Sequence, residues 1–259
     1  MSRESENYSC ERSRVGSLTA KLLGVRPNTR SPWRERFSVV ADRLVSEYGV
    51  PTLGNFRDPV KEILYILLSA KTTDAQYRRT HRKLMAAYPK LADLAVATVA
   101  GVRECIESGG LARKRSAQLI GVARELIAAC GRYPTRFLRK LDADRAYNLI
   151  SGLPGMGPKS ALCVIMYSLD FDAFPVDVNV QRIADRMGAI PKGLKHYQAQ
   201  RRLAAIVPDR RSRELHIGLV VHGRAVCLPR KPDCGNCCLN DMCKTGRKKP
   251  IAMEVESLE

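Results

Sequence analysis

The sequence predicts an all-α protein, and three features of the chain support this fold class. Apolar residues recur at helical spacing through most of the chain from Arg34 onward. Capping residues, prolines and glycines mark where these runs begin and end. No segment shows the sustained period-two alternation of a half-buried strand. With 259 residues, the chain is long enough for one or two domains with a sizeable core.

The first helical run starts at Arg34 and stops at Gly49, Val50 and Pro51. Asp58 and Pro59 then provide a cap and a first helical residue. The body of that helix is apolar on nearly all sides, which is typical of a buried central helix. Further helices are expected at Asp74–Tyr88, Thr98–Ser108, Ser116–Cys130, Asp142–Ser151, Pro158–Leu169, Val178–Met187, Lys195–Val207 and Ser212–Val226.

Both ends of the chain lack a sustained apolar period. We expect residues 1–32 to form a mobile basic tail, with at most a short helix near Leu18–Leu23. Residues 246–259 are expected to form a second tail that starts basic and turns acidic from Glu254.

The charge balance points to a polyanionic partner. Lys and Arg total 44 against 26 Asp and Glu, which gives a formal net charge of +18. Such a surplus favours nucleic acid first and an anionic membrane surface second. No run approaches the ~18 apolar residues that are needed to cross a bilayer. The N-terminus lacks the pattern of a signal peptide, so an intracellular location in the cytoplasm or nucleoid is expected.

The stretch from Leu153 to Arg182 combines a glycine hairpin with two ionisable residues. Gly155 and Gly157 lie in a Pro/Gly-rich turn, where the backbone takes unusual dihedrals or lets a ligand approach. A helix then begins, and Lys159 lies in its first turn, where the positive end of the helix dipole repels a cation. Asp177 follows 18 residues later, at the expected N-cap of the next helix. Taken singly, these residues could be a surface lysine and an ordinary capping aspartate.

The C-terminal quarter holds a cysteine cluster. Cys227, Cys234, Cys237 and Cys243 form the pattern C-x6-C-x2-C-x5-C, and Cys238 lies outside it. Clustered cysteines in an intracellular chain indicate a metal before disulfides. Four thiolates could hold tetrahedral zinc or an iron–sulfur cubane, and spacing alone does not separate the two.

The helix–hairpin–helix element, the spacing of lysine and aspartate, and the four cysteines after an HGR sequence resemble the endonuclease III family of DNA glycosylases. The resemblance covers about residues 35–245. It implies a six-helix barrel at residues 52–171, which contains the hairpin, and a cluster domain made of residues 33–51 and 172–245. It also implies that the four cysteines ligate a [4Fe-4S] cluster. Lys159 and Asp177 would face each other across the mouth of a DNA groove.

The same resemblance implies a set of DNA contacts. Lys71 replaces the glutamine that, in relatives, enters the space left by an extruded base. Leu111 would be an apolar wedge in the duplex, and neighbouring cations would hold phosphates. The hairpin amides near the two glycines could cradle a phosphate. The expected phosphate-binding residues are Arg113, Lys114, Gly155, Gly157, Arg230 and Lys231.

The resemblance implies a bifunctional DNA glycosylase and AP lyase that excises oxidised or otherwise modified pyrimidines. Its partner would be duplex DNA with damaged bases or abasic sites, bound by a monomer. Neutral Lys159 would form a Schiff base, and the helix dipole with nearby cations is expected to disfavour its ammonium form. Asp177 would stabilise positive charge on the sugar.

Two alternatives remain open at the level of sequence. One is a monofunctional glycosylase on the same scaffold; Asn179 favours it, whereas Lys159 argues against it. The other is a noncatalytic helix–hairpin–helix DNA-binding module. The segment from Ala173 to Gly188 also resembles plant 5-methylcytosine glycosylases, which suggests a shifted lesion range.

Overall fold

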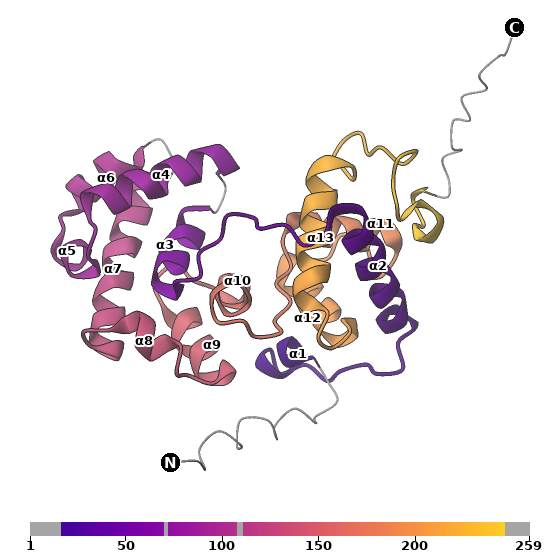
Figure 1. Ribbon diagram of the computed structural model, residues 1–259, viewed down its shortest axis with the longest axis horizontal. Coiled ribbons are helices and arrows are strands. Elements are labelled where there is room, and N and C mark those ends of the chain that lie inside the picture. The colour runs from indigo at the N-terminus through magenta and orange to yellow at the C-terminus, as the bar shows by residue number, and fades with distance from the viewer. Residues whose placement is uncertain (1–16, 70–71, 108–110, 247–259) are drawn as a thin grey trace, which may run out of the picture.

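The computed structural model describes residues 17–69, 72–107 and 111–246, and within these ranges the regular elements are all helices. The helices form two groups that lie side by side (Figure 1). Each group has its own apolar core, and the chain passes from the first core to the second between Ala173 and Phe174.

The first core surrounds α3 (Pro59–Ser69), in which Ile63 to Leu68 are all buried. α10 (Pro158–Ser168) packs against α3 and is itself buried from Ala161 to Ser168. The remaining helices of this group are α4 (Asp74–Ala87), α5 (Leu91–Val96), α6 (Val99–Ile106), α7 (Ala112–Cys130), α8 (Pro134–Leu138) and α9 (Ala143–Gly152). α3 is therefore the central helix that its apolar sequence predicts.

The second core joins an early segment of the chain to the C-terminal part. α2 (Pro32–Tyr48) packs along α13 (Ser212–Ala225), and α11 (Val178–Met187) and α12 (His196–Ile206) complete the group. The short 3-10 helix η3 (Asn240–Met242) lies in the cysteine segment. An added Cβ at Gly218 would lie 2.7 Å from Leu44 Cβ, so a glycine is needed where α2 and α13 meet. α13 also contributes Ile217 to the first core and thus touches both groups.

The expected short helix near Leu18–Leu23 is present, but the prediction of a mobile tail through residue 32 is wrong for residues 17–31. α1 (Leu18–Leu22) packs between α9 and α12 (Figure 1), with Thr19 and Ala20 fully buried. Lys21 pairs with Asp144 of α9, and Arg201 of α12 donates to Leu23 O at 2.6 Å. These partners are far away in sequence, so a local pattern could not reveal them. Residues 1–16 and 247–259, which include the rest of both expected tails, lie outside the described residues.

Helix boundaries agree with the expected ones except at short elements and at α7. α5 and α8 have six and five residues and carry too little periodicity to be predicted. α7 begins at Ala112, four residues before the expected Ser116, and its N-cap is Leu111 at φ 51°. Among the described residues, no helix has the length and apolarity that crossing a bilayer requires.

Candidate active site and cysteine pocket

The hairpin between α9 and α10 contains two glycines with different roles. Gly155 has φ +79°, and an added Cβ would lie 2.5 Å from Gln118 Nε2 and 2.8 Å from Leu67 Cδ1. Gly157 has φ −123° and is the N-cap of α10, and no atom lies within 4 Å of its added Cβ. Gly155 therefore makes the turn possible, whereas Gly157 leaves open space at the start of α10.

Lys159 follows directly, in the first turn of α10. Cys163, one helical turn later, and the carboxyl groups of Asp177 and Glu62 are close enough to act on its charge. The pKa of Lys159 lies above its ordinary value because Cys163, Asp177 and Glu62 together outweigh the cost of burying the ammonium. The expectation of a lowered lysine pKa is therefore wrong for the DNA-free protein. The largest contribution comes from Cys163 on the same helix, and Asp177 and Glu62 add to it from other elements.

Asp177 lies at the N-cap of α11, as expected. Its Oδ1 accepts hydrogen bonds from the amides of Asn179 at 2.9 Å and Val180 at 2.8 Å, and its Oδ2 accepts from Asn179 Nδ2 at 2.9 Å. Burial acts to raise the pKa of Asp177, but His216, these donors and Lys159 outweigh it, and the pKa is lowered. The Asp177 carboxylate and the Lys159 ammonium group thus stabilise each other's charge across the boundary between the two cores.

Asn179 connects Asp177 with the cysteine segment. Its Oδ1 accepts from Arg182 Nη2 at 2.9 Å, and the same guanidinium donates to Gly223 O at 2.7 Å and Cys227 O at 3.0 Å. A Cβ at Gly223 would lie 2.7 Å from Asn179 Cβ, so the glycine of the HGR sequence lets α13 approach α11. Asn179 therefore orients the Asp177 carboxylate from one end of a polar chain.

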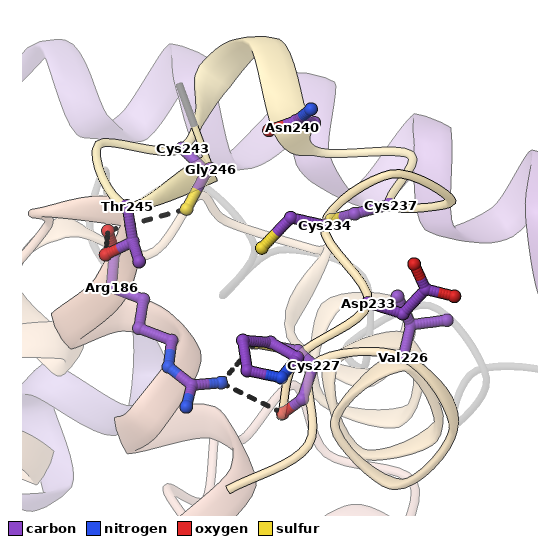
Figure 2. A pocket seen from close by; sticks show the side chains of 11 residues that line it. Arg186, Val226, Cys227, Asp233, Cys234, Cys237, Asn240, Cys243, Thr245 and Gly246 are labelled. Carbon is purple, nitrogen blue, oxygen red and sulfur yellow. Dashed lines mark hydrogen bonds between the residues drawn. The ribbon is translucent and has the colours of Figure 1, made fainter. Parts of the chain in front are cut away.

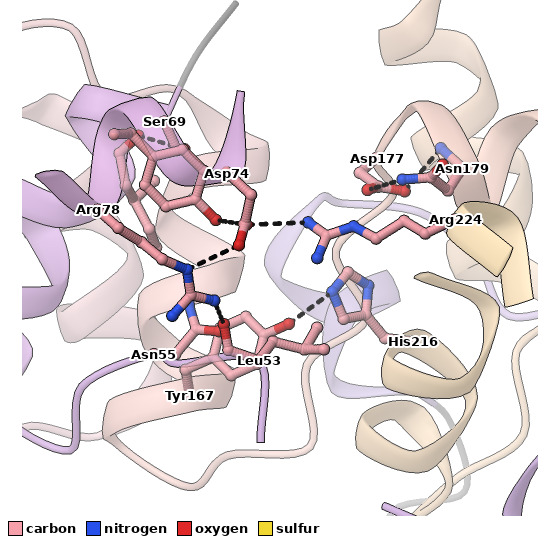
Figure 3. A network of polar contacts seen from close by, with 12 residues as sticks. Leu53, Asn55, Ser69, Asp74, Arg78, Tyr167, Asp177, Asn179, His216 and Arg224 are labelled. Carbon is pink, nitrogen blue, oxygen red and sulfur yellow. Dashed lines mark hydrogen bonds and ion pairs between the residues drawn. The ribbon is translucent and has the colours of Figure 1, made fainter. Parts of the chain in front are cut away.

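A second polar network lies on the other side of Asp177 (Figure 3). His216 of α13 contacts Pro175 O through Nδ1 at 2.8 Å and the Tyr167 hydroxyl through Nε2 at 3.0 Å. Nearer the solvent, Arg224 of α13 pairs with Asp74 of α4 at 3.5 Å. The His216–Tyr167 and Arg224–Asp74 contacts each join the two groups of helices.

The four predicted cysteine ligands line one pocket, together with Arg186 of α11 (Figure 2). Arg186 Nη1 lies 3.1 Å from Cys227 Sγ, and His222 Nε2 lies 3.3 Å from Cys237 Sγ. Cys238 is not among the lining residues, which agrees with its exclusion from the ligand pattern. No three Cys, His, Asp or Glu side chains in the described part of the chain converge on one point as ligands of a single ion.

Two predicted DNA-contact groups lie on exposed surface. Leu111 is 57% exposed at the start of α7, and Arg113 and Lys114 follow on the exposed side of its first turn. The next residue, Arg115, is buried and donates to Thr72 Oγ1 at 3.0 Å. This bond ties the Leu111 segment to the loop before α4. Lys71, in that loop, lies outside the described residues.

Arg230 and Lys231 are exposed in the loop between the first two cysteines. Arg186 holds this loop from within, because its guanidinium donates to Leu228 O and Pro229 O, both at 2.8 Å. The side chains of Arg230 and Lys231 therefore project from a loop whose backbone is anchored.

Three site residues were missed in the sequence. Glu62 and His216 are 0% and 3% exposed and come from α3 and α13, so that only tertiary packing brings them to Lys159 and Asp177. Cys163 had a possible signal, since it lies four residues after Lys159 on a helix.

An all-helical fold with a glycine hairpin leading into a lysine-bearing helix, an aspartate N-cap and a four-cysteine pocket defines a helix–hairpin–helix protein. Residues 64–209 match the family model of the HhH-GPD superfamily of base excision DNA repair proteins, and the chain belongs to this family. The resemblance to endonuclease III is thereby confirmed.

Relatives and solved structures agree with this assignment. The chain is 31% identical over 175 residues to an Arabidopsis thaliana protein provisionally named a DNA glycosylase, covering 68% of this chain and 57% of that protein. It is 29% identical over 197 residues to endonuclease III of Escherichia coli, covering 76% of this chain and 89% of that enzyme. A trapped covalent endonuclease III–DNA intermediate has the same fold, with a TM-score of 0.72 at 23% identity over 83% of this chain and 97% of that one.

Proposed function

We propose that this protein is a bifunctional DNA glycosylase and AP lyase of base excision repair. The observation that carries the proposal is the electrostatic pairing of Lys159, which follows a glycine hairpin, with the Asp177 carboxylate, within a chain of the HhH-GPD superfamily: each group shifts the pKa of the other toward its charged form. A noncatalytic DNA-binding module would need neither the pair nor its buried supports. The E. coli relative, an endonuclease III, supports the same class of activity.

The proposed reaction starts with extrusion of the damaged nucleotide, because a base inside the stack hides its glycosidic carbon. The ionised carboxylate of Asp177 stabilises positive charge that develops on the sugar. Asp177 also lies close enough to Lys159 to act on its charge, and it can accept the lysine proton. The neutral amine then attacks C1′, the base leaves with the glycosidic electron pair, and ring opening gives a Schiff base. Loss of a C2′ proton expels the 3′ phosphate and completes the lyase step.

We propose modified pyrimidines as the substrates, and oxidised pyrimidines ahead of 5-methylcytosine. Asn179 stands where the family usually has histidine, and its amide is occupied by Asp177 and Arg182. This substitution changes the pocket beside the carboxylate while leaving Lys159 and Asp177 in place. A lesion range that is narrower or shifted relative to endonuclease III is the expected consequence.

The four-cysteine pocket fits a [4Fe-4S] cluster ligated by Cys227, Cys234, Cys237 and Cys243. Such a cluster would cross-link the C-terminal segment that carries Arg230 and Lys231. Purified protein should be yellow-brown and should contain about four irons per chain. A colourless protein with one zinc would contradict this assignment.

A monofunctional glycosylase is the second candidate, and one observation favours it. The raised pKa of Lys159 keeps the amine protonated in the DNA-free protein, and an ammonium group cannot attack a carbon. In that case Asp177 would activate a water molecule, and Lys159 would act only by its charge.

The test combines a lesion panel with borohydride trapping. Duplexes should carry thymine glycol, 5-hydroxycytosine, 5-methylcytosine, uracil, 8-oxoguanine opposite C, or adenine opposite 8-oxoguanine. The bifunctional enzyme should excise an oxidised pyrimidine and become covalently trapped on that DNA. Excision without trapping would establish the monofunctional alternative, and preference for either purine substrate would overturn the assigned lesion class.

A further inference from the structure

The segment that leads into Asp177 belongs to no helix, and buried side chains from other elements hold its backbone. Phe174 N donates to Thr19 Oγ1 of α1 at 2.7 Å. Gln200 of α12 bonds the segment twice, since its Oε1 accepts from Val176 N at 2.8 Å and its Nε2 donates to Phe174 O at 2.9 Å. Thr19 and Gln200 are 0% and 2% exposed. Buried polar side chains are costly unless their hydrogen bonds are made, so these contacts hold the segment firmly.

His216 completes this set of contacts at Pro175, which lies between Phe174 and Val176. Pro175 O can only accept a hydrogen bond, so His216 Nδ1 carries the proton of that 2.8 Å contact. Burial lowers the pKa of His216 to about 4, so the ring is neutral at physiological pH. Its Nε2 must then accept, and the Tyr167 hydroxyl donates to it at 3.0 Å. The structure thereby specifies both the tautomer of His216 and the direction of each hydrogen bond.

Tyr167 links this network to the helix of Lys159. Residues 159, 163 and 167 are spaced by four along α10 and share one face of it. The Tyr167–His216–Pro175 bridge therefore runs from the lysine-bearing helix, through α13, to the backbone two residues before Asp177. It crosses the boundary between the two apolar cores at the place where the proposed catalytic groups meet.

We propose that Gln200, His216 and Tyr167 are positioning residues that hold the Asp177 carboxylate at a fixed place relative to Lys159. This inference rests on the proposed function for its catalytic consequence. Its structural content, a clamped segment at residues 174–177, stands independently of that function. None of the three side chains needs to touch DNA, since all three are buried.

The kinetic test uses Gln200→Leu and Tyr167→Phe, which remove hydrogen bonds with little change of volume. A misplacement of about 1 Å can cost about 100-fold in rate. We therefore expect each variant to lower the single-turnover excision rate at least about tenfold, with DNA affinity changed less than about twofold. Tyr88→Phe, a half-buried tyrosine at the end of α4, is the matched control and should leave the rate unchanged. A lowered melting temperature with a normal excision rate would overturn the positioning role.

Two measurements test the clamp without any activity. Nitrogen chemical shifts of His216 should show the neutral Nδ1–H tautomer from pH 5 to 8. The Val176 amide should exchange with solvent slowly in the native protein and at least about tenfold faster in Gln200→Leu, because its buried acceptor is lost. A titrating His216 or an unchanged Val176 exchange rate would refute the clamp. If the native protein excised no lesion but passed both measurements, the proposed function would fail and the clamp would stand.

Discussion

Three ionisable side chains from three elements surround the amine of Lys159: Cys163 on its own helix, Asp177 on α11 and Glu62 on α3. They stabilise the ammonium form, so a nucleophilic amine requires a change when DNA binds. Asp177, whose lowered pKa keeps it ionised, is the group that the proposed chemistry can use as proton acceptor. Glu62 is the other carboxyl. Burial raises its pKa to about 7, although Phe56 N, Asn55 and Lys159 act in the opposite direction.

The raised pKa of Glu62 makes a prediction about stability. Between pH 4.5 and about 7 the folded state binds a proton at Glu62 that the unfolded chain has released. The contribution of Glu62 to the free energy of unfolding therefore falls as pH rises through this window. The loss amounts to roughly 3 kcal/mol at most. Glu62→Gln stays neutral and, after rotation of the Asn55 amide, can still pair with Asn55 and Phe56 N.

The measurement is the free energy of unfolding of both proteins by urea from pH 4.5 to 8. The variant should gain stability relative to the native protein as pH rises through this window, because only the native protein loses the Glu62 contribution. Other titrating groups contribute equally to both proteins, so they cancel in the difference. A difference that stays constant with pH would show that Glu62 is ionised throughout the window.

At the scale of elements, the hairpin before α10 determines where Lys159 lies. Gly155 supplies a left-handed turn packed against α3 and α7, and Gly157 supplies an open N-cap. The two glycines are two residues apart but differ in conformation and in surroundings. A matched pair of substitutions therefore separates folding from ligand approach.

We predict that Gly155→Ala destabilises the protein by about 2 kcal/mol or more, because the methyl group adds backbone strain and overlaps Gln118 and Leu67. Gly157→Ala should cost less than about 1 kcal/mol, since it meets no atom and has an extended backbone. Thermal unfolding of both variants checks the ranking. Equal losses of stability would mean that the hairpin is not the rigid turn described above.

Periodicity, caps and glycines were enough to locate the long helices and the residues Lys159 and Asp177, because these signals are local. The prediction failed where structure depends on distant partners. α1 packs against α9 and α12, Asp177 and Glu62 of other elements help to raise the Lys159 pKa, and His216 contacts Pro175 O across 41 residues. α5 and α8 were missed because one helical turn carries little pattern.

At the scale of the whole molecule, two cores meet along a boundary that α1, α13 and the 174–177 segment cross. The chain carries a formal net charge of +18. Its exposed cations include Arg113, Lys114, Arg230 and Lys231. Each phosphate that such cations neutralise releases counterions from DNA.

DNA affinity should therefore fall steeply with salt. The double variant Arg230→Gln/Lys231→Gln should reduce the slope of log affinity against log salt by about 2, as expected for the loss of two phosphate contacts. The control is the double variant Arg136→Gln/Lys140→Gln. Both residues are exposed; Arg136 lies in α8 and Lys140 just after it, in the other group of helices (Figure 1). This control removes the same charge and should change the slope less. Equal slopes for both double variants would mean that the cysteine loop does not face DNA.

The central claim is that Lys159 forms a covalent intermediate with DNA beside the Asp177 carboxylate. Borohydride trapping on a duplex with a single abasic site tests it most directly, with Lys159→Gln and Asp177→Asn as companions. The native protein should be captured covalently, Lys159→Gln should bind the same DNA without capture, and Asp177→Asn should lose most base excision at little cost in affinity. Peptide mapping should locate the adduct at Lys159. Capture of Lys159→Gln at the native rate, or an adduct on another residue, would contradict the account.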